Sequence, residues 1–573
     1  MEQGGNMMKK RLMVVFIALS LMFVSALAEI QDGTYTTKAW GNNGEMQVET
    51  VIEGGKIASV IIVEDQETNG VSDVPLAQLP QDIVNAQSVG VDIYAGASMT
   101  SRGILNAVSE ALTEAGADLA QWKTPVHREA AAAEDAECDV LVIGSGAAGI
   151  TASIHAAQNG AKVIMVEKLD FVGGTSLLSA SMFGSVGTSV HQAEGKTETV
   201  EDLVENYMKK EAATGAYAEE ASARILAENS AAAAEYLIGL GVNFDHTSSK
   251  FILAPTAGKR VGEMVIPALM GEAEKAGVEV RVSTKALHLV MEDGKAAGAV
   301  VQNANGEYTI HAKAVVMATG GYAANRTMVS QYMPEWSNSI YYCSPGDTGD
   351  GIIMAQEAGL KVVDLTVMKA NPLVFYDRTC ALTMNSAVSA GAIMVNHEGK
   401  RFANEQGSYG ISPIINSQTK GEGIVLFDNT LVESNATMQE YLEKGYLTEA
   451  ESLAELAEKL EINGDALAET VARYQQLAAA GKDEDFGRGK VADLYSGATF
   501  YGIIVKPSIQ GTFGGIRTNT ETEVFNESDE IVPGMYAVGE CAQEGVNGLN
   551  PMTTNLVYGK ICGEHAAAYV KGI

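Results

Sequence analysis

The sequence is poor in cysteine and histidine, and neither residue follows a functional pattern. The odd number and wide spacing of the cysteines argue against a disulfide framework, and the absence of a C-x-x-C-H motif excludes an attached c-type haem. The eight histidines lack the spacing of metal ligands, so no metal site is predicted. The five cysteines are Cys138, Cys343, Cys380, Cys541 and Cys562.

Positive charge is also scarce. The chain has 39 Lys and Arg against 72 Asp and Glu, a formal net charge of -33. This balance argues against nucleic acid or an anionic membrane surface as a partner. With 573 residues, of which 46% are hydrophobic, the chain has the composition of a globular protein with two to four domains.

The apolar run nearest the N-terminus is short. Residues 12–24 form a run of 13 residues, which is too short to span a membrane comfortably. Three basic residues precede it at positions 9–11, and an A-x-A cleavage site follows at 26–28. This is the layout of a secretory signal peptide. We expect cleavage after Ala28 and export to the periplasm or the cell exterior.

Residues 138–168 predict a dinucleotide site. Two short apolar runs, at 139–143 and 162–166, are typical of buried parallel strands. Between them, residues 144–149 give G-x-G-x-x-G at the point where the first strand turns into a helix. Glu167 ends the second strand, where a carboxylate can accept hydrogen bonds from an adenosine ribose. A glycine motif alone is weak evidence for such a site. Here the strand, the turn, the helix, the second strand and the terminal acid all follow in the order that a dinucleotide-binding unit requires.

Another motif, DIYAGASMT, occupies residues 92–100. It resembles the D-x-x-[ST]-G-A-[ST] pattern of FMN-binding domains in which a flavin transferase joins the FMN phosphate to a Ser or Thr hydroxyl. The resemblance makes Ser98 the acceptor, with Thr100 as a second candidate, although Ala95 departs from the usual Ser or Thr. The strands expected at 46–52 and 57–63 support such a domain. The alternative is an ordinary helix start with Ser98 as its N-cap.

Four glycine-rich elements farther along the chain complete the pattern: GGTS at 173–176, AVVMATGG at 314–321, TGDG at 348–351 and PGMYAVGE at 533–540. From residue 138 onward the chain thereby resembles the flavoprotein subunits of fumarate reductase, succinate dehydrogenase and L-aspartate oxidase. With the FMN motif, the architecture is similar to that of soluble fumarate and urocanate reductases.

The resemblance implies an α/β fold: a Rossmann-like FAD-binding domain with an inserted α+β capping domain, preceded by a small α+β FMN-binding domain. The expected boundaries are a signal peptide at 1–28, an FMN-binding domain at 30–122, a linker at 123–137, an FAD-binding domain at 138–370 and 509–573, and a capping domain at 371–508.

The same resemblance implies that FAD is bound without a covalent link, that Glu167 binds the adenosine ribose and that Glu540 binds the ribityl region. The full set of expected FAD-binding residues is Gly144, Gly146, Ala147, Ala148, Gly149, Glu167, Lys168, Gly173, Gly174, Thr175, Ser176, Thr319, Gly320, Gly321, Asp350, Glu540, Asn555 and Leu556.

The dicarboxylate-binding residues of the family are replaced in this chain. The histidine of H-P-T becomes Asn371, the proton-donating arginine falls on Tyr409, and the histidine of H-x-T-M-G-G becomes Gln510. The arginine of G-A-N-R becomes Pro551, and the T-E-x-x-R stretch becomes residues 384–388. A buried dicarboxylate needs cationic partners, so fumarate is not expected as the main substrate.

The residues that remain still suit alkene reduction. Tyr409 is the candidate acid, because a phenol with a pKa of about 10 can donate a proton and be reloaded by solvent. It could equally be a packing residue. Asn371, Gln510 and Asn550 are neutral donors that could polarise a carbonyl group. Arg378 is the one basic group expected near the start of the cap that could hold a single carboxylate.

The sequence therefore predicts an exported reductase. Electrons would pass from FMN on Ser98 to FAD and then, as hydride, to an activated C=C bond of a neutral or monocarboxylate molecule. The implied partners are a flavin transferase, an electron donor outside the cytoplasm and the unsaturated substrate, in support of anaerobic respiration. Two alternatives stay open: a dehydrogenase of a ketone-containing substrate, and a flavin electron carrier without catalysis.

Overall fold

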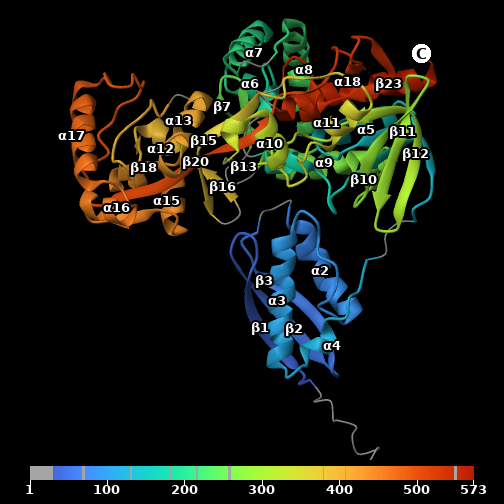
Figure 1. Cartoon of the computed structure of the whole chain (residues 1–573), viewed down its shortest axis with the longest axis horizontal. Coiled ribbons are helices and arrows are strands. Elements are labelled where there is room, and N and C mark those ends of the chain that lie inside the picture. The colour runs from blue at the N-terminus through green and yellow to red at the C-terminus, as the bar shows by residue number, and fades with distance from the viewer. Residues whose placement is uncertain are drawn as a thin grey trace, which may run out of the picture. The chain divides into compact units, whose positions relative to one another are not determined.

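The structure is a computed structural model that describes residues 30–67, 71–128, 132–179, 183–214, 217–255, 260–337, 339–377, 380–406, 408–546 and 551–572. The chain divides into two compact units, of which the first comprises residues 1–68 and 72–129 and the second comprises residues 69–71 and 130–573 (Figure 1). The proposed signal peptide lies outside the described residues. No helix among the described residues is long and apolar enough to cross a membrane.

The first unit is a three-stranded antiparallel meander covered by two helices. The strand pair expected around the Gly54–Gly55 turn is present, and alternate residues of β2 are buried against α2 and α3. Residues 123–128, expected in a linker, pack on this unit, since Val126 N–H donates to the carbonyl of Gly90 at 3.1 Å. The elements are β1 Gly33–Trp40, β2 Glu45–Glu53, β3 Lys56–Glu64, α2 Asp73–Ala86, α3 Ser98–Glu114 and α4 Leu119–Trp122.

The second unit is built on a sheet of eight strands with the order β10-β11-β12-β4-β5-β9, in which β23 pairs with both β12 and β22. Strands β4, β5, β9, β12 and β23 run parallel where they pair, and β10, β11 and β12 form an antiparallel meander. The strands are β4 Ala136–Ile143, β5 Val163–Val166, β9 Glu279–Arg281, β10 Lys285–Glu292, β11 Lys295–Asn303, β12 Gly306–Met317, β22 Glu523–Phe525 and β23 Ile531–Ala537.

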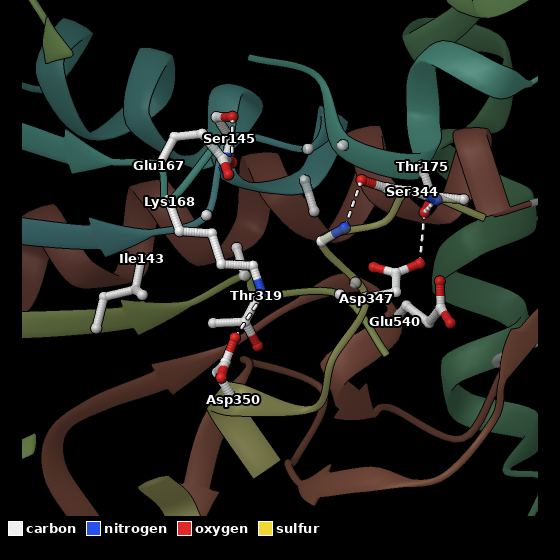
Figure 2. A pocket seen from close by; sticks show the side chains of 18 of the residues that line it. Ile143, Ser145, Glu167, Lys168, Thr175, Thr319, Ser344, Asp347, Asp350 and Glu540 are labelled. Atoms are coloured by element: carbon white, nitrogen blue, oxygen red, sulfur yellow. Dashed lines mark hydrogen bonds and ion pairs between the residues drawn. The ribbon is translucent and has the colours of Figure 1, made fainter. Parts of the chain in front are cut away.

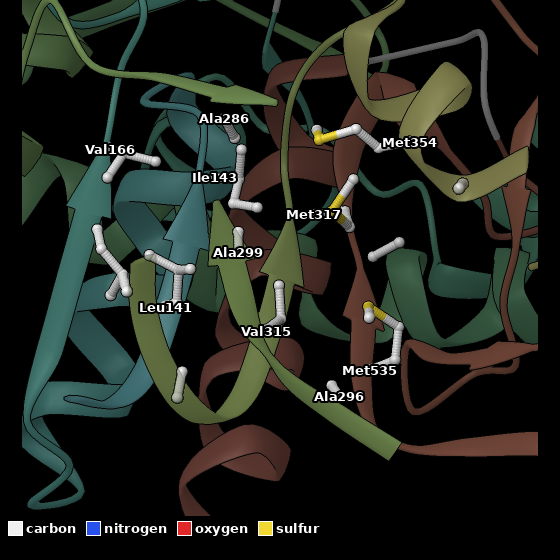
Figure 3. Close-up of a cluster of buried hydrophobic side chains, with 14 of the residues drawn as sticks. Leu141, Ile143, Val166, Ala286, Ala296, Ala299, Val315, Met317, Met354 and Met535 are labelled. Atoms are coloured by element: carbon white, nitrogen blue, oxygen red, sulfur yellow. The ribbon is translucent and has the colours of Figure 1, made fainter. Parts of the chain in front are cut away.

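The centre of this sheet is covered on both faces, as its apolar strands require. Leu141, Ile143, Val315 and Met317 are buried within one cluster (Figure 3). Each such side chain contributes about 1.5 to 3 kcal/mol of burial free energy. The α-helices around the sheet are α5 Ala147–Gln158, α6 Ser189–Ala193, α7 Val200–Thr214, α8 Glu220–Gly239, α9 Val261–Lys275, α10 Arg326–Tyr332, α11 Asp350–Glu357 and α18 Pro551–Lys571.

Short elements complete this part of the unit. Two small sheets have the strand orders β14-β21-β24 and β6-β8-β7. The bounds are β6 Phe183–Gly184, β7 Phe244–Ser249, β8 Ile252–Pro255, β14 Val362–Val363, β21 Gly515–Arg517, β24 Ala542–Gln543, and the 3-10 helices η1 Gly174–Leu178, η2 Pro334–Trp336 and η5 Gly539–Cys541.

The insertion forms a second sheet with the order β16-β15-β20-β18-β17, and two further strands, β13 and β19, pair with β20. It has two apolar clusters of its own, which gives it the α+β character expected for a cap. The elements are β13 Ile340–Tyr341, β15 Met368–Asp377, β16 Cys380–Thr383, β17 Ile393–Val395, β18 Gly423–Asp428, β19 Thr448–Ala450, β20 Phe500–Thr512, α12 Asn385–Ala390, η3 Ser408–Ile411, α13 Ser412–Asn416, η4 Thr419–Gly421, α14 Asn429–Ser434, α15 Ala436–Glu443, α16 Leu453–Lys459 and α17 Gly464–Ala480.

Candidate functional site

A cavity lies at the carboxyl ends of β4, β5 and β12. In open α/β sheets these ends carry the loops that bind nucleotides. The glycine loop at 144–148 leads from β4 into α5, and the turn at 174–176 and the strand end at 318–320 form neighbouring walls. We call this space the dinucleotide cavity. It is completed by residues around 344–350, by residues 538–540 and by Asn555.

The glycine loop has backbone geometry that excludes larger residues. Gly144 has a φ of 109°, and a Cβ at this position would collide with the carbonyl of Ala318. A Cβ on Gly149 would collide with the carbonyl of Gly144, so this glycine allows the close approach of helix and strand. Above Gly146 the space is open, and a Cβ there would meet only Ser176 Oγ at 3.8 Å. A diphosphate can therefore reach the backbone at the N-terminus of α5.

Two carboxylates at this cavity are held by fixed donors. Glu167 Oε2 accepts hydrogen bonds from the backbone N–H and the hydroxyl of Ser145, at 3.1 and 2.6 Å (Figure 2). Asp350 forms ion pairs with Lys168 and, at 3.0 Å, with Lys285. Although burial opposes it, these lysines hold the pKa of Asp350 below its ordinary value. Glu167 thus stands at the end of β5, where the sequence predicts an acceptor for an adenosine ribose.

A buried acidic pair, Asp347 and Glu540, lies farther along the same cavity. Thr175 donates its hydroxyl proton to Asp347 and accepts a hydrogen bond from the Ser344 N–H at 2.8 Å (Figure 2). Glu540 accepts from the Thr512 N–H at 2.9 Å. Burial raises the pKa of both carboxyl groups, and Asp347 raises that of Glu540 further. A protonated carboxyl can donate a hydrogen bond to the hydroxyls of a bound cofactor.

The structure brings together most of the residues expected to bind FAD. Four do not line the cavity: Gly149 lies within α5 against the Gly144 carbonyl, Gly173 directly precedes η1, Gly321 lies against Glu540, and Leu556 is buried within α18. The expected residues that line it are Gly144, Gly146, Ala147, Ala148, Glu167, Lys168, Gly174, Thr175, Ser176, Thr319, Gly320, Asp350, Glu540 and Asn555.

A second cavity continues from the first toward the cap, and we call it the junction cavity. Its walls include Gln510, Lys369, Tyr342 and Pro551. Glu544 also lines it and is 2% exposed, with Oε1 accepting from the Gly539 N–H at 3.0 Å. Burial raises the pKa of Glu544 to about 8. The residues that line both this cavity and the dinucleotide cavity are Thr175, Ser176, Gly539, Glu540 and Asn555.

A third cavity, the cap cavity, lies between β15, β20 and the helical part of the insertion. Asn371 and Gln510 both line it, so two of the predicted catalytic residues meet there. Asn371 is 8% exposed, and its Oδ1 accepts from the Leu373 N–H at 3.1 Å. Lys369 and Gln510 line the junction cavity as well as the cap cavity.

The far wall of the cap cavity is set by buried charges. Glu405 accepts from Arg401 at 2.8 Å and from Arg488 at 3.1 Å, and the side chains of Glu405 and Arg488 have no exposed surface. Asp483 pairs with Arg401 at 2.8 Å. Arg401 is thus engaged in ion pairs within the cap. The positive charges of Arg401 and Arg488 therefore compensate the negative charge of Glu405 at this wall of the cavity.

The structure locates only one of the remaining predicted site residues. Residue 409 belongs to η3, which packs beside β15. Asn550 and Arg378 lie outside the described residues. The sequence interpretation made Arg378 the one basic group near the start of the cap, and this is wrong, because Lys369 stands two residues before Asn371 and lines the cavity.

The first unit presents the predicted FMN acceptor at the beginning of α3. Ser98 is the first helical residue and Ala97 occupies the cap position, so the N-cap alternative is wrong. Ser98 is partly exposed, whereas Thr100 is 1% exposed and donates its hydroxyl proton to Glu67. Ser101 is fully buried and donates to the Ala97 carbonyl at 3.0 Å. Among these three hydroxyls, Ser98 is the accessible one.

The start of the FMN motif is fixed by residues expected in the linker. Asp92 Oδ1 is 2.8 Å from His127 Nδ1, and Asp92 Oδ2 accepts from the Arg128 N–H at 2.9 Å. The Arg128 guanidinium also stacks on Tyr94, 3.6 Å from the ring centroid. These contacts hold the loop that leads to Ser98.

Sequence reasoning missed several residues that line the cavities, among them the charged residues Asp347, Lys369 and Glu544. Asp347 directly precedes the TGDG element and could have been found by extending that motif. Glu544 and Lys369 carry no local signal, because only the approach of distant strands and loops makes them cavity residues.

Comparison with known proteins places these features in a family. Residues 139–557 match the "FAD binding domain" family, and residues 41–113 match the "FMN-binding domain" family. The chain is 32% identical to "Fumarate reductase (cytochrome)" of Shewanella frigidimarina, over 79% of this chain and 81% of that one. It is 30% identical to "Urocanate reductase" of Eggerthella lenta, over 93% and 92%.

A solved structure extends the likeness to the fold. The open conformation of a flavocytochrome c3 fumarate reductase matches with a TM-score of 0.69 and 32% identity, covering 76% of this chain and 79% of that chain. The dinucleotide cavity therefore belongs to an FAD-binding domain, and the first unit to an FMN-binding domain. The chain is a member of the fumarate reductase/succinate dehydrogenase flavoprotein superfamily, in the group with an N-terminal FMN-binding domain.

Proposed function

We propose that this protein is an exported flavin reductase that reduces an activated C=C bond of a small monocarboxylate or neutral molecule other than fumarate. One observation carries the proposal. The junction cavity shares five lining residues with the dinucleotide cavity, and it shares Gln510 with the cap cavity, which Asn371 also lines. A substrate in it would touch both the cofactor and the cap.

The relatives support reduction of a C=C bond. Fumarate and urocanate, named in two of these relatives, are both α,β-unsaturated carboxylates. Fumarate itself is disfavoured here, because no arginine is found among the described residues that line the junction and cap cavities. A second carboxylate buried in these cavities would lack a bidentate partner.

The side chains can activate an alkene that is conjugated to a carbonyl. When bound and reduced by electrons from FMN, FAD would supply the hydride for the β-carbon. Gln510 and Asn371 provide amide N–H groups that can stabilise negative charge on the carbonyl oxygen. A proton must then reach the α-carbon, and we assign its donation to Tyr409. The product gains one hydride and one proton.

Replacement of Tyr409 by Phe tests the acid. We expect turnover to fall by about 100-fold or more, in keeping with the loss of a general acid, while the FAD content stays unchanged. Steady-state kinetics and the flavin absorbance of the purified protein give both quantities. Unchanged turnover would remove Tyr409 from the mechanism.

We assign covalent FMN attachment to Ser98, by a phosphoester that a flavin transferase forms. The support is the motif at 92–100 together with the exposure of Ser98 and the burial of Thr100. Ser98→Ala should abolish the flavin fluorescence of the protein on a denaturing gel, whereas Thr100→Val should retain it. Attached flavin in Ser98→Ala protein would defeat this assignment.

We further propose that the mature protein acts outside the cytoplasm and receives electrons there from a membrane or extracytoplasmic donor. The support is the signal-peptide pattern that ends at Ala28 and the acidity of the chain. N-terminal sequencing of the protein from fractionated cells tests this. A cytoplasmic protein that retains residues 9–28 would contradict it.

The central test is anaerobic stopped-flow reoxidation of the dithionite-reduced holoprotein. The panel contains acrylate, crotonate, cinnamate and urocanate, the primary amide of each, and fumarate. Rapid reoxidation by an enoate or its amide is the expected result. Rapid reoxidation by fumarate alone would contradict the substrate class. No acceleration by any compound would favour an electron carrier.

A further inference from the structure

The sheet of the insertion contains a β-bulge between β15 and β20. Along β15 and β20, Lys369 pairs with Gly511 and the next residue, Ala370, pairs with Ile509. Gln510 is therefore the extra residue on its strand and has no partner in this register. Bulges redirect side chains and are frequent beside active sites.

The bulge gives Lys369 and Gln510 a position that the other described residues do not share. Of the described residues, only these two line both the junction cavity and the cap cavity. The junction cavity adjoins the dinucleotide cavity at Thr175 and Glu540. A molecule that extends from the cofactor toward the cap must pass the side chains of Lys369 and Gln510.

Lys369 also sets the charge of this passage. It is the one cationic side chain among the described residues that line the junction and cap cavities. Three acidic residues line the same cavities, namely Glu405, Glu540 and Glu544. Glu405 is already paired with Arg401 and Arg488, and burial favours the neutral forms of Glu540 and Glu544, an effect that Lys369 opposes at Glu540. An anionic group of the substrate gains most by lying next to Lys369.

Resting on the proposed function, we infer that Lys369 is the specificity-determining residue, whose ammonium pairs with the single carboxylate of an unsaturated monocarboxylate, next to the Gln510 amide. The single positive charge of Lys369 can neutralise a single carboxylate of the substrate. A dicarboxylate would place its second charge among Asn371, Asn385 and Ser389, which carry no positive charge. The structure thereby narrows the substrate from neutral or monocarboxylate to monocarboxylate.

The test compares each acid of the panel with its primary amide in wild-type and Lys369→Met holoprotein. The amide keeps the alkene and the shape but lacks the charge. We expect kcat/KM for the acids to fall by about 10- to 100-fold in Lys369→Met, the effect of a lost charge-assisted hydrogen bond. The amides should change by less than about threefold, and Lys369→Arg should recover part of the loss.

Binding is measured separately from turnover, by the change that crotonate or cinnamate produces in the absorption spectrum of the oxidised flavin. Wild-type protein should bind the acid more tightly than the amide, and Lys369→Met should lose this preference. Lys459→Met is the matched control, since this lysine lies on the cap surface and pairs with Glu455 at 2.7 Å. It should behave as wild type.

The outcomes separate the two proposals. If wild-type protein reduces none of the panel, the proposed function fails, and the binding preference still decides the role of Lys369. The inference about Lys369 is overturned if wild-type protein binds neither acid or prefers the amide, or if Lys369→Met weakens acid and amide equally. If Lys369→Met loses FAD or changes the flavin potential while the preference for the acid stays intact, Lys369 acts on the cofactor and not on the substrate.

Discussion

The dinucleotide cavity and the junction and cap cavities are built in different ways. The first is shaped by backbone: glycines at 144 and 146, strand ends and a helix N-terminus. The other two are shaped by side chains, namely Lys369, Gln510, Asn371 and buried charges. A cofactor site built from main chain tolerates little change, whereas a wall of side chains can be altered one residue at a time. This difference fits a family in which FAD is constant and the substrate varies.

The largest effect is expected where the backbone forms the site. Gly144→Ala introduces a Cβ into the carbonyl of Ala318 at a φ of 109°. We expect loss of bound FAD and of all flavin-dependent turnover, together with a destabilisation of more than about 3 kcal/mol from overpacking and backbone strain. Flavin absorbance per protein and urea unfolding measure these effects.

Gly277→Ala is the control for backbone strain alone. Gly277 has a φ of 78°, but a Cβ there would meet no atom within 4 Å. The expected cost is about 1 to 2 kcal/mol, with FAD retained. Equal losses in the two variants would mean that strain, and not the collision at Ala318, controls the dinucleotide cavity.

Removal of a buried charge in the cap should be the next largest effect. Arg488 has no exposed side-chain surface and donates to Glu405 and to the Val388 carbonyl, at 3.1 and 2.8 Å. Arg488→Met should destabilise the protein by about 3 to 5 kcal/mol, because it removes one partner of a buried ion pair. It should raise KM while the FAD content stays constant, since it alters the cap cavity alone.

The exposed pair Arg473–Asp485 provides the control. It lies on α17 and in the segment that follows, with the arginine side chain 48% exposed and the contact at 2.7 Å. Arg473→Met should cost no more than about 1 kcal/mol and leave KM unchanged. If both arginine variants leave KM unchanged, the buried charges of the cap do not shape the substrate site.

The smallest expected effect appears as a pH dependence in the junction cavity. Because burial raises the pKa of Glu544 to about 8, the folded protein holds a proton that the unfolded chain releases near pH 4.5. Stability is therefore lost as the pH rises, by up to about 1.4 kcal/mol per pH unit between these values. Glu544→Gln lacks this contribution.

Urea unfolding of wild-type and Glu544→Gln protein at pH 6 and pH 8 measures this pH-dependent contribution of Glu544 to the free energy of unfolding. The stability of the variant relative to wild type should increase by about 2 to 3 kcal/mol over these two pH units. The other titratable groups contribute equally in both proteins, so their contributions cancel in the difference between variant and wild type. A difference that does not vary with pH would mean that Glu544 is ionised, and the junction cavity would then carry a second charge.

The sequence alone predicted the elements whose function depends on a local residue pattern. The strand–glycine–helix–strand unit and the strand pair before Ser98 follow from apolar periodicity and from glycines that no other residue can replace, whereas most of the other residues expected at the dinucleotide cavity came from the resemblance to a family. These signals are local, because each depends on neighbours within a few residues along the chain.

Tertiary structure decided which side chains meet at the substrate site. Lys369 was overlooked because nothing in its neighbourhood along the chain marks it, and only its pairing with Gly511, more than a hundred residues later, brings it beside Gln510. Burial against distant elements likewise decided that Ser98 is accessible while Thr100 is not, and that the pKa of Glu544 is raised. Exposure, charge and strand register depend on the whole fold, so short-range pattern cannot supply them.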